Sequence, residues 1–250
     1  APWQNPGCMS ITLEMRRHSA AHVMAAAIQR LFPAAKFGVG PAIEHGFYYD
    51  VDLPRPLTTE DLTRIQETIA TIVKEKPAFT REEMSIDEAI AFFEGLGQTY
   101  KVELLQDLKT KGTTAVKDVG EEFDVANVES VSVYRTGAFA DLCRGPHVET
   151  ADQIGVVKLT KIAGAYWRGK DTNPQLQRVY GWCFATQEEL DAHAKMVEEA
   201  EKRDHRKLGK ELGLFIFSDL VGPGLPLWTP RGTVLRELLN DFVQELRKPQ

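Results

Sequence analysis

Hydrophobic residues that recur at helical spacing mark the first part of this chain as largely helical. The first predicted helix runs from about Leu13 to Phe32 and ends before Pro33, which cannot continue a helix. A second helix follows Thr58, and a capping box at Ser85–Glu88 predicts a third, short helix that ends near Gly95. The residues expected to face the core are Met24, Ala27, Ile28 and Leu31 in the first helix and Ile65, Ile69, Ile72 and Val73 in the second.

Shorter alternating segments predict strands. They are Phe37–Val39, Gly46–Val51, Tyr100–Leu105, Ser130–Tyr134, Ala138–Cys143, Gly155–Thr160 and Gln177–Phe184. The fourth and fifth of these are expected to form a hairpin around Arg135-Thr136-Gly137. The polar segment Gln106–Glu129 is expected to be an excursion or insertion. This order of elements predicts an α+β fold, with helices packed on a mostly antiparallel sheet.

The last quarter of the chain is predicted to contain a charge-rich helix, two short strands and a final helix. A capping box at Thr186–Glu189 opens a charge-rich helix that is predicted to reach about Leu212, and its solvated surface is typical of a connector between domains. Short strands are predicted at Leu214–Phe217 and Leu225–Trp228. Thr229 then caps a final helix through Arg247, with proline at the first helical position.

Composition narrows the class of protein. With 250 residues, of which 43% are apolar, the chain can form a sizeable core in one or two domains. A net charge of −6 argues against a uniformly basic nucleic-acid binder but allows a local basic patch. Three irregularly spaced cysteines indicate reduced thiols in a cytoplasmic protein. No signal-peptide pattern and no run long enough to span a bilayer is present, so no membrane association is expected.

Two pairs of residues carry the clearest chemistry. His18 and His22 lie one helical turn apart and can point toward one spot, and Cys143 and His147 flank a Gly-Pro turn. If the fold brings the pairs together, three nitrogens and one sulfur can bind Zn²⁺ or organise a water for hydrolysis. Each pair alone is also compatible with a surface or core polar pair. A zinc protease is disfavoured, because Ser19 stands where that helix motif carries its glutamate base.

A basic and aromatic region lies downstream. Between Ile154 and Cys183, five basic residues against Asp171 give a balance of +4. The basic residues are Lys158, Lys161, Arg168, Lys170 and Arg178, and they alternate with Tyr166, Trp167, Tyr180 and Trp182. This pattern is typical of a surface that binds a single-stranded nucleic-acid end. It is equally typical of a sheet whose aromatic residues lie in the core and whose lysines face solvent.

From about Leu13 to Arg247 the chain resembles the editing domain of bacterial threonyl-tRNA synthetases and the segments that follow it. Five segments in the family's order carry the resemblance: Arg17–His22, Gly40–Asp50, Asp141–His147, Ala163–Gly169 and Lys202–Gly209. The resemblance implies an editing domain at 1–185, a linker helix at 186–212 and the truncated start of a class II catalytic domain at 213–250. The remaining core, which holds ATP and zinc and forms the homodimer in the family, has no counterpart here, so the chain is not expected to aminoacylate.

The implied function is post-transfer editing, the hydrolysis of seryl-tRNA(Thr), as part of a threonine–tRNA ligase. The residues carried over as catalytic are His18, His22, Lys101, Asp141, Cys143 and His147. Candidate contacts to the acceptor end of the tRNA are Arg144, Lys158, Lys161, Tyr166, Trp167 and Arg168. No cofactor is expected for editing, although zinc would bind the His–Cys set. The alternatives are a zinc-dependent deacylase of the alanyl type, whose editing domains share this set, and a tRNA-binding module without chemistry.

Overall fold

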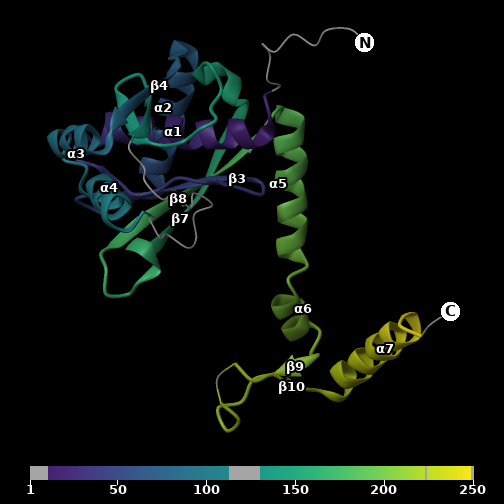
Figure 1. Cartoon of the computed structure of the whole chain (residues 1–250). Coiled ribbons are helices and arrows are strands. Elements are labelled where there is room, and N and C mark those ends of the chain that lie inside the picture. The colour runs from purple at the N-terminus through teal and green to yellow at the C-terminus, as the bar shows by residue number, and fades with distance from the viewer. Residues whose placement is uncertain (1–10, 113–129, 223, 249–250) are drawn as a thin grey trace. The chain divides into compact units, whose positions relative to one another are not determined.

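A computed structural model describes residues 11–112, 130–222 and 224–248. The chain forms two compact units, residues 1–190 and 191–250 (Figure 1). The three-part division expected from the resemblance stays a prediction. None of the helices in the described ranges combines the length and hydrophobicity that a membrane span needs.

An antiparallel sheet forms the centre of the first unit, with strand order β1–β3–β8–β7 and the short β2 paired to β3. Its strands are β1 (Lys36–Phe37), β2 (Ala42–Ile43), β3 (Gly46–Asp52), β7 (Val156–Tyr166) and β8 (Gln175–Phe184). β3 and β8 approach closely at one end, where a Cβ on Gly46 would lie 1.9 Å from the Gly181 carbonyl oxygen. Only glycine fits at that position.

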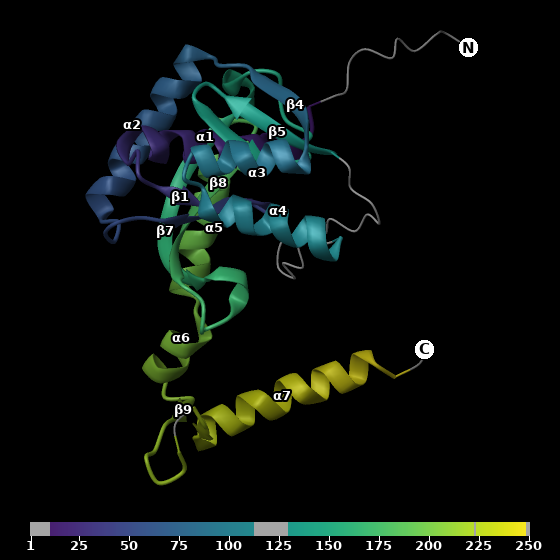
Figure 2. The same ribbon diagram turned by 60° about the vertical axis from the view of Figure 1, so that its left-hand side comes forward.

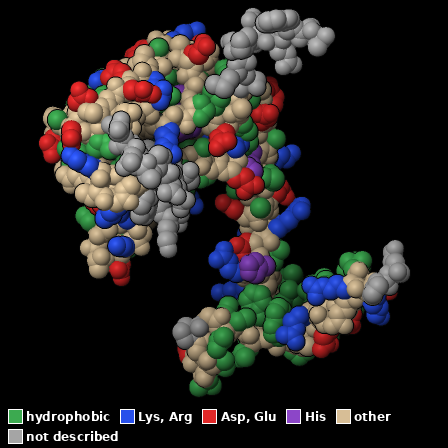
Figure 3. All heavy atoms as spheres, viewed as in Figure 1, with side chains coloured by type: hydrophobic (Ala, Val, Ile, Leu, Met, Phe, Trp, Pro, Cys, Tyr) green, Lys and Arg blue, Asp and Glu red, His purple; other side chains and the backbone are tan. Residues whose placement is uncertain are grey.

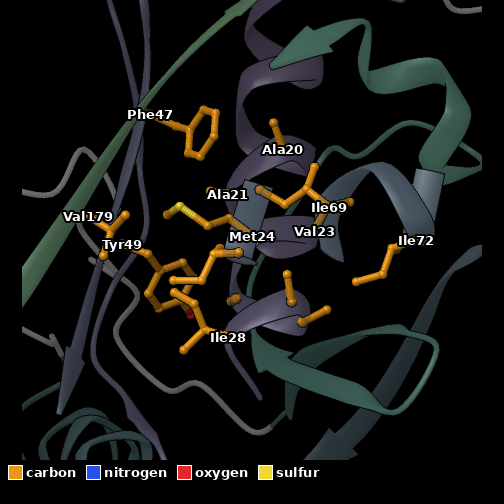
Figure 4. Packing of buried hydrophobic residues seen from close by; sticks show 14 of the residues in the cluster. Ala20, Ala21, Val23, Met24, Ile28, Phe47, Tyr49, Ile69, Ile72 and Val179 are labelled. Carbon is orange, nitrogen blue, oxygen red and sulfur yellow. The ribbon is translucent and has the colours of Figure 1, made fainter. Parts of the chain in front are cut away.

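Helices α1 (Leu13–Leu31) and α2 (Thr59–Glu75) pack beside this sheet, and α1 lies across β3 and β8 (Figure 1). Both predicted helices are confirmed, and Thr58 caps α2 by accepting a hydrogen bond from the Asp61 backbone N–H. The expected core stripe of α1 is wider than predicted, because every residue from Ser19 to Ile28 is buried. Its small alanines allow the sheet and α2 to approach from different sides (Figure 4).

A second layer of the first unit combines a three-stranded antiparallel sheet with two helices. The sheet runs β4–β5–β6, with β4 at Phe79–Ser85, β5 at Ser130–Thr136 and β6 at Phe139–Leu142. The helices α3 (Ile86–Gly95) and α4 (Thr99–Lys111) lie side by side (Figure 2). Two 3₁₀ turns, η1 (Ala151–Ile154) and η2 (Trp167–Gly169), flank β7. The hairpin of β5 and β6 and the Ser85 capping box are confirmed.

Two assignments in this layer differ from the sequence expectations. Tyr100–Leu105 was expected to be a strand but belongs to helix α4, because Tyr100, Leu104 and Leu108 lie one turn apart and are buried together. β4 was not predicted, since its Phe-Thr-Arg-Glu-Glu-Met-Ser sequence is mostly polar and its side chains are mostly exposed. Residues 113–129, most of the expected excursion, lie outside the described residues. The α+β class is confirmed.

In its described residues, the C-terminal segment contains three helices and one small hairpin. They are α5 (Gln187–Lys202), α6 (His205–Glu211), β9 (Phe215–Ile216), β10 (Leu227–Trp228) and α7 (Pro230–Leu246). The single helix expected through Leu212 is wrong, because Asp204 breaks it and caps α6 by accepting the Arg206 N–H. The last helix is confirmed, with Thr229 as its N-cap and Pro230 in its first turn.

Candidate active site

The two residue pairs singled out in the sequence converge on one spot in the first unit. His18 and His22 extend from α1, while Cys143 and His147 follow β6. The Cys143 Sγ lies 3.2 Å from His18 Nε2 and 3.2 Å from His147 Nε2. One ligand atom from each of the four residues fits within 4.8 Å of all the others. The predicted convergence of the two pairs is therefore confirmed, and these four residues are called the tetrad below.

The turn after β6 fixes the position of Cys143. Its backbone N–H donates to the Ser132 carbonyl at 3.1 Å, and its own carbonyl accepts from the Ser132 hydroxyl at 2.6 Å. The Gly145 N–H then donates to the Cys143 sulfur at 3.2 Å. Gly145 has φ +73°, and a Cβ there would lie 2.4 Å from the Tyr134 hydroxyl, so both conformation and space require glycine.

Ser19, between the two histidines of α1, holds the fourth member of the tetrad. Its hydroxyl oxygen lies 3.0 Å from His147 Nδ1 and accepts a hydrogen bond from the Val148 N–H at 3.0 Å. The Phe79 ring stacks on His147, with centroids 5.0 Å apart and planes 10° apart. Sequence reasoning missed both residues as parts of the site. The position of Ser19 directly after His18, between the two histidines, was the available signal for it.

Behind the tetrad lies a buried charged group, formed by Lys101, Asp141 and Tyr49. The Lys101 ammonium forms an ion pair with Asp141 and donates to the Tyr49 hydroxyl at 3.2 Å, and that hydroxyl donates to Asp141. Lys101 and Asp141 are each 3% exposed, and Tyr49 is fully buried. The structure therefore places both sequence-predicted residues next to the tetrad but away from solvent. Tyr49 was missed, because it reads as an ordinary core position of an alternating strand.

Asp141 connects this buried group to the tetrad through His22. The His22 Nε2 lies 3.4 Å from the Asp141 carboxylate. This contact favours the tautomer with the proton on Nε2 and leaves a lone pair on Nδ1. Within the described part of the chain, the buried Nδ1 has no hydrogen-bond partner. An unpaired basic nitrogen of this kind is typical of a site that binds a water, a substrate or a metal ion.

Burial sets the protonation of the three imidazoles. It lowers the pKa of His18, although the charge of Asp141 partly opposes the shift. It lowers the pKa of His22 much further, and the nearby His18 and Lys101 add to the effect. The pKa of His147 is lowered by burial and by the other two histidines. All three rings are therefore neutral at pH 7 and can accept a proton or bind a metal.

The tetrad is a chemically suitable zinc site. Three imidazole nitrogens and one thiolate are ligands that Zn²⁺ takes in tetrahedral geometry, and the unpaired His22 Nδ1 is one such donor. Asp141 would orient His22, as carboxylates that accept a hydrogen bond from a metal-bound histidine do. The same atoms without a metal form a hydrogen-bonded group around the Cys143 sulfur.

A pocket of about 250 Å³ opens beside His18. Its walls are the start of α1, the loop before β3 and the Gly145–Pro146 turn. Met15, Pro41, Ala42 and Pro146 make most of the lining apolar, and Glu14 and His18 are its titratable side chains. A small ligand can therefore reach the His18 side of the tetrad.

The residues predicted to contact tRNA fall into two groups. Arg144, next to the pocket, is exposed, as are Lys158, Lys161 and Tyr166 on or near β7. Lys158 and Lys161 lie over the rings of Trp182 and Tyr180, at 5.9 and 4.8 Å from their centroids. Trp167 and Arg168 are engaged inside the first unit instead. Trp167 is buried and donates to Glu103 at 3.0 Å, and Arg168 pairs with Asp107 and Glu103.

Comparison with known proteins adds to this geometry. Residues 131–180 match the second additional domain of threonyl and alanyl tRNA synthetases. The chain is 49% identical over 230 residues, or 92% of its length, to the threonine–tRNA ligase of Citrifermentans bemidjiense. It is 49% identical over 236 residues to that of Gloeobacter violaceus and 46% identical over 233 residues to that of Nitratidesulfovibrio vulgaris. The chain spans about a third of the length of these relatives, 33%, 34% and 33% respectively.

The domain match and the threonine–tRNA ligase relatives together indicate an editing module of the aminoacyl-tRNA synthetase type. The similarity along nearly the whole chain is to threonine–tRNA ligases of bacteria. The resemblance stated from the sequence, to a fragment of a bacterial threonyl-tRNA synthetase that contains its editing domain, is thus confirmed.

Proposed function

We propose that this chain hydrolyses the ester that joins serine to threonine tRNA, as the post-transfer editing part of a threonine–tRNA ligase. One observation carries the proposal: three neutral imidazoles and a cysteine meet beside a small pocket, and one imidazole nitrogen there is unpaired. The similarity to threonine–tRNA ligases supplies the class of substrate. The partner in this proposal is the acceptor end of tRNA(Thr), in the cytoplasm, and the parent enzyme is a homodimer.

Ester hydrolysis requires a base that takes a proton from water while the water oxygen attacks the carbonyl carbon. His18 and His22 are neutral and suit this role, since one lines the pocket and the other has a free nitrogen. The bond between the carbonyl carbon and the ribose oxygen then breaks. The imidazolium returns its proton to the ribose oxygen, so that the base is regenerated. Cys143 and Ser19 hold the His18 and His147 rings in place.

Lys101 and Asp141 act as positioning residues in this proposal. The Lys101 ammonium is a candidate to steady the leaving oxygen, and Asp141 is a candidate either to orient an imidazole or to bind the substrate ammonium. Both groups are buried and paired with each other, which favours the alternative that Asp141 orients an imidazole. Lys101 and Tyr49 hold the Asp141 carboxylate in a fixed position that faces His22.

Seryl and threonyl esters differ by one methyl group, so the difference in binding free energy between them is small. One missing or extra methyl group is worth about 1–3 kcal/mol in a binding pocket, which is too little for accurate synthesis in a single step. A second site that excludes the threonine methyl sterically would multiply that selectivity. Apolar side chains of Met15, Pro41, Ala42 and Pro146 line the pocket and are the candidates to contact that methyl group.

No metal is required in this proposal. Without a metal, the Cys143 sulfur is hydrogen-bonded to His18, His147 and the Gly145 N–H, and the unpaired His22 Nδ1 is the atom left to hold a water. If zinc is bound, His18, His22, Cys143 and His147 are its ligands, and it would supply a Lewis acid at this position.

Single-turnover deacylation at high protein concentration tests the proposal. The chain should hydrolyse seryl-tRNA(Thr), spare threonyl-tRNA(Thr) and keep its activity after exhaustive chelation. His18→Ala should slow hydrolysis by about 10²–10⁴-fold, the usual contribution of a general base. The matched control His205→Ala changes an exposed histidine of α6 in the other unit and should have no effect.

Three outcomes would contradict parts of the proposal. Binding of the acceptor end without hydrolysis would indicate a tRNA-binding module. Activity that is lost on chelation and restored by zinc would indicate a zinc-dependent deacylase of the alanyl type. Equal rates on seryl and threonyl esters would indicate a deacylase that does not discriminate by the methyl group.

A further inference from the structure

The pocket beside the tetrad contains a carboxylate that the hydrolysis described above does not use. Glu14 lies four residues before His18 on α1, so both side chains are on the same face of the helix, and both line the pocket. Burial lowers the pKa of His18, and the negative charge of Glu14 opposes part of that shift. Glu14 is exposed, and no hydrogen bond or ion pair of its carboxylate is present within the described residues. It is therefore a negative charge with no internal partner, directed into the space where a ligand would reach His18.

The other carboxylate of the site cannot meet a substrate charge. Asp141 is 3% exposed, and its oxygens are engaged by Lys101 and Tyr49 and face His22. A further cation brought to Asp141 would also meet the Lys101 ammonium. Glu14 is the one carboxylate among the residues that line the pocket.

The proposed substrate has one positive charge, the α-ammonium of its aminoacyl group, and many negative phosphates. A carboxylate attracts the first and repels the second. Most other walls of the pocket are apolar, so this charge orients the bound ester. The ammonium faces Glu14, and the tRNA backbone lies away from it. With the ammonium held there, the adjacent carbonyl carbon is brought toward His18, one helical turn further along α1.

We propose that Glu14 is a specificity-determining residue that binds the α-ammonium of the aminoacyl ester in this pocket. The inference rests on the proposed hydrolysis of seryl-tRNA. It assigns substrate recognition to a surface residue of α1 and leaves Asp141 with an internal role. The ligand group recognised is a protonated α-amine next to an ester carbonyl.

The test compares two esters that differ only in this charge. Seryl-tRNA carries the ammonium, and glyceroyl-tRNA, its analogue, carries an α-hydroxyl in the same position. Glu14→Gln removes the carboxylate charge with little change of shape. It should slow single-turnover hydrolysis of seryl-tRNA at subsaturating protein by about tenfold, as expected for loss of one partly solvated charge-assisted hydrogen bond. Hydrolysis of glyceroyl-tRNA should change less than twofold.

Two control variants separate recognition from helix stability. Glu60 lies in the first turn of α2 as Glu14 lies in the first turn of α1, and it is exposed, so Glu60→Gln tests the effect of removing an acid from a helix start. It should leave both rates unchanged. Glu14→Asp keeps the charge and should retain a preference for the seryl ester.

The outcomes are distinct from those of the proposed function. If wild type hydrolyses neither ester, the proposed hydrolysis fails. If wild type is active and Glu14→Gln hydrolyses seryl-tRNA at the wild-type rate, the assignment of Glu14 is wrong. A loss of equal size on both esters would also overturn it, because Glu14 would then act on His18 or on the fold and not on the ammonium.

Discussion

The two compact units of this chain differ in how far their hydrophobic side chains are buried. In the first unit, Met24, Ile28 and Phe47 are fully buried between α1, α2 and the sheet (Figure 4). In the second, Leu238 is 63% exposed and Leu246 is 69% exposed on α7, and hydrophobic side chains gather on the surface of this unit (Figure 3). The first unit is stabilised by tertiary packing, whereas the start of α7 is set by the local signals Thr229 and Pro230.

The same contrast holds for charges. The first unit buries the Lys101–Asp141 ion pair and surrounds it with Tyr49 and His22. The pairs that Lys202 forms with Glu198 and Glu199 in the second unit lie on the surface of α5. Buried groups depend on one another, while exposed pairs can be lost singly. The comparison predicts that matched substitutions will have very different effects in the two units.

The largest difference is expected for the ion pairs. Lys101→Met leaves the buried Asp141 carboxylate without its main partner, which typically costs about 3–5 kcal/mol. Lys202→Met removes a solvated pair and should not change stability measurably. Urea unfolding followed by circular dichroism measures both. Equal shifts in the two variants would contradict the distinction between the units.

Core truncation should give the next largest difference. Ile28→Ala removes a fully buried side chain from α1 and should cost about 2–5 kcal/mol of unfolding free energy. Leu238→Ala removes an exposed side chain of similar size and should change it by less than about 0.5 kcal/mol. If Leu238→Ala proves as costly as Ile28→Ala in the chain alone, α7 is packed in solution against a surface that buries it.

Local sequence signals account for the part of the structure that was predicted correctly. The capping residues Thr58, Ser85 and Thr229 start their helices where the sequence indicates, because a side-chain cap acts over three residues. The i, i+4 histidines and the Gly-Pro turn marked the four members of the tetrad, although their convergence depended on the fold. The resemblance added Lys101 and Asp141, which no local pattern marks.

The sequence predictions failed where contacts between distant parts of the chain determine the structure. Tyr100–Leu105 alternates well enough for a strand, yet its packing against α3 makes it helical. Tyr49 joins the site only because β3 passes behind Asp141, at a distance of 92 residues in sequence. Trp167 and Arg168 looked available for nucleic acid, but Glu103 and Asp107 on α4 hold them. Such pairings depend on the fold and cannot be found from neighbouring residues.

The buried histidines of the first unit predict a stability that depends on pH. In the unfolded chain a histidine takes up a proton below its ordinary pKa of about 6.5, while the lowered pKa values of His18, His22 and His147 keep these rings neutral in the fold. The unfolded state then binds more protons, so stability is fully present above about pH 6.5 and falls as the pH decreases. Below about pH 6.5, each ring that stays neutral in the fold lowers the free energy of unfolding by about 1.4 kcal/mol per pH unit.

Urea unfolding at pH 7.5 and pH 5.5 measures this loss in a range where carboxylates contribute little. Stability should be lower at pH 5.5, and His147→Asn should reduce the difference between the two pH values. His205→Ala, in the second unit, should leave that difference unchanged. Stability that is constant or increases toward pH 5.5 would show that the tetrad takes up protons in the folded state.

The smallest difference is expected for the helix caps, and it isolates the role of packing most directly. Thr58 and Thr229 are both N-caps, each accepting a hydrogen bond from the backbone N–H three residues later at 3.2 Å. Replacing such a cap by alanine typically lowers the unfolding free energy of the cooperative structure that contains the helix by about 1 kcal/mol.

α2 is packed into the core through Ile65, Ile69 and Ile72, so Thr58→Ala should lower the unfolding free energy of the first unit by that amount. α7 buries only Gly232, so Thr229→Ala should reduce far-ultraviolet helical signal without moving the main urea transition. A shift of the transition by Thr229→Ala equal to that by Thr58→Ala would show that α7 unfolds together with the first unit, and the two regions would then have to be treated as one cooperative structure.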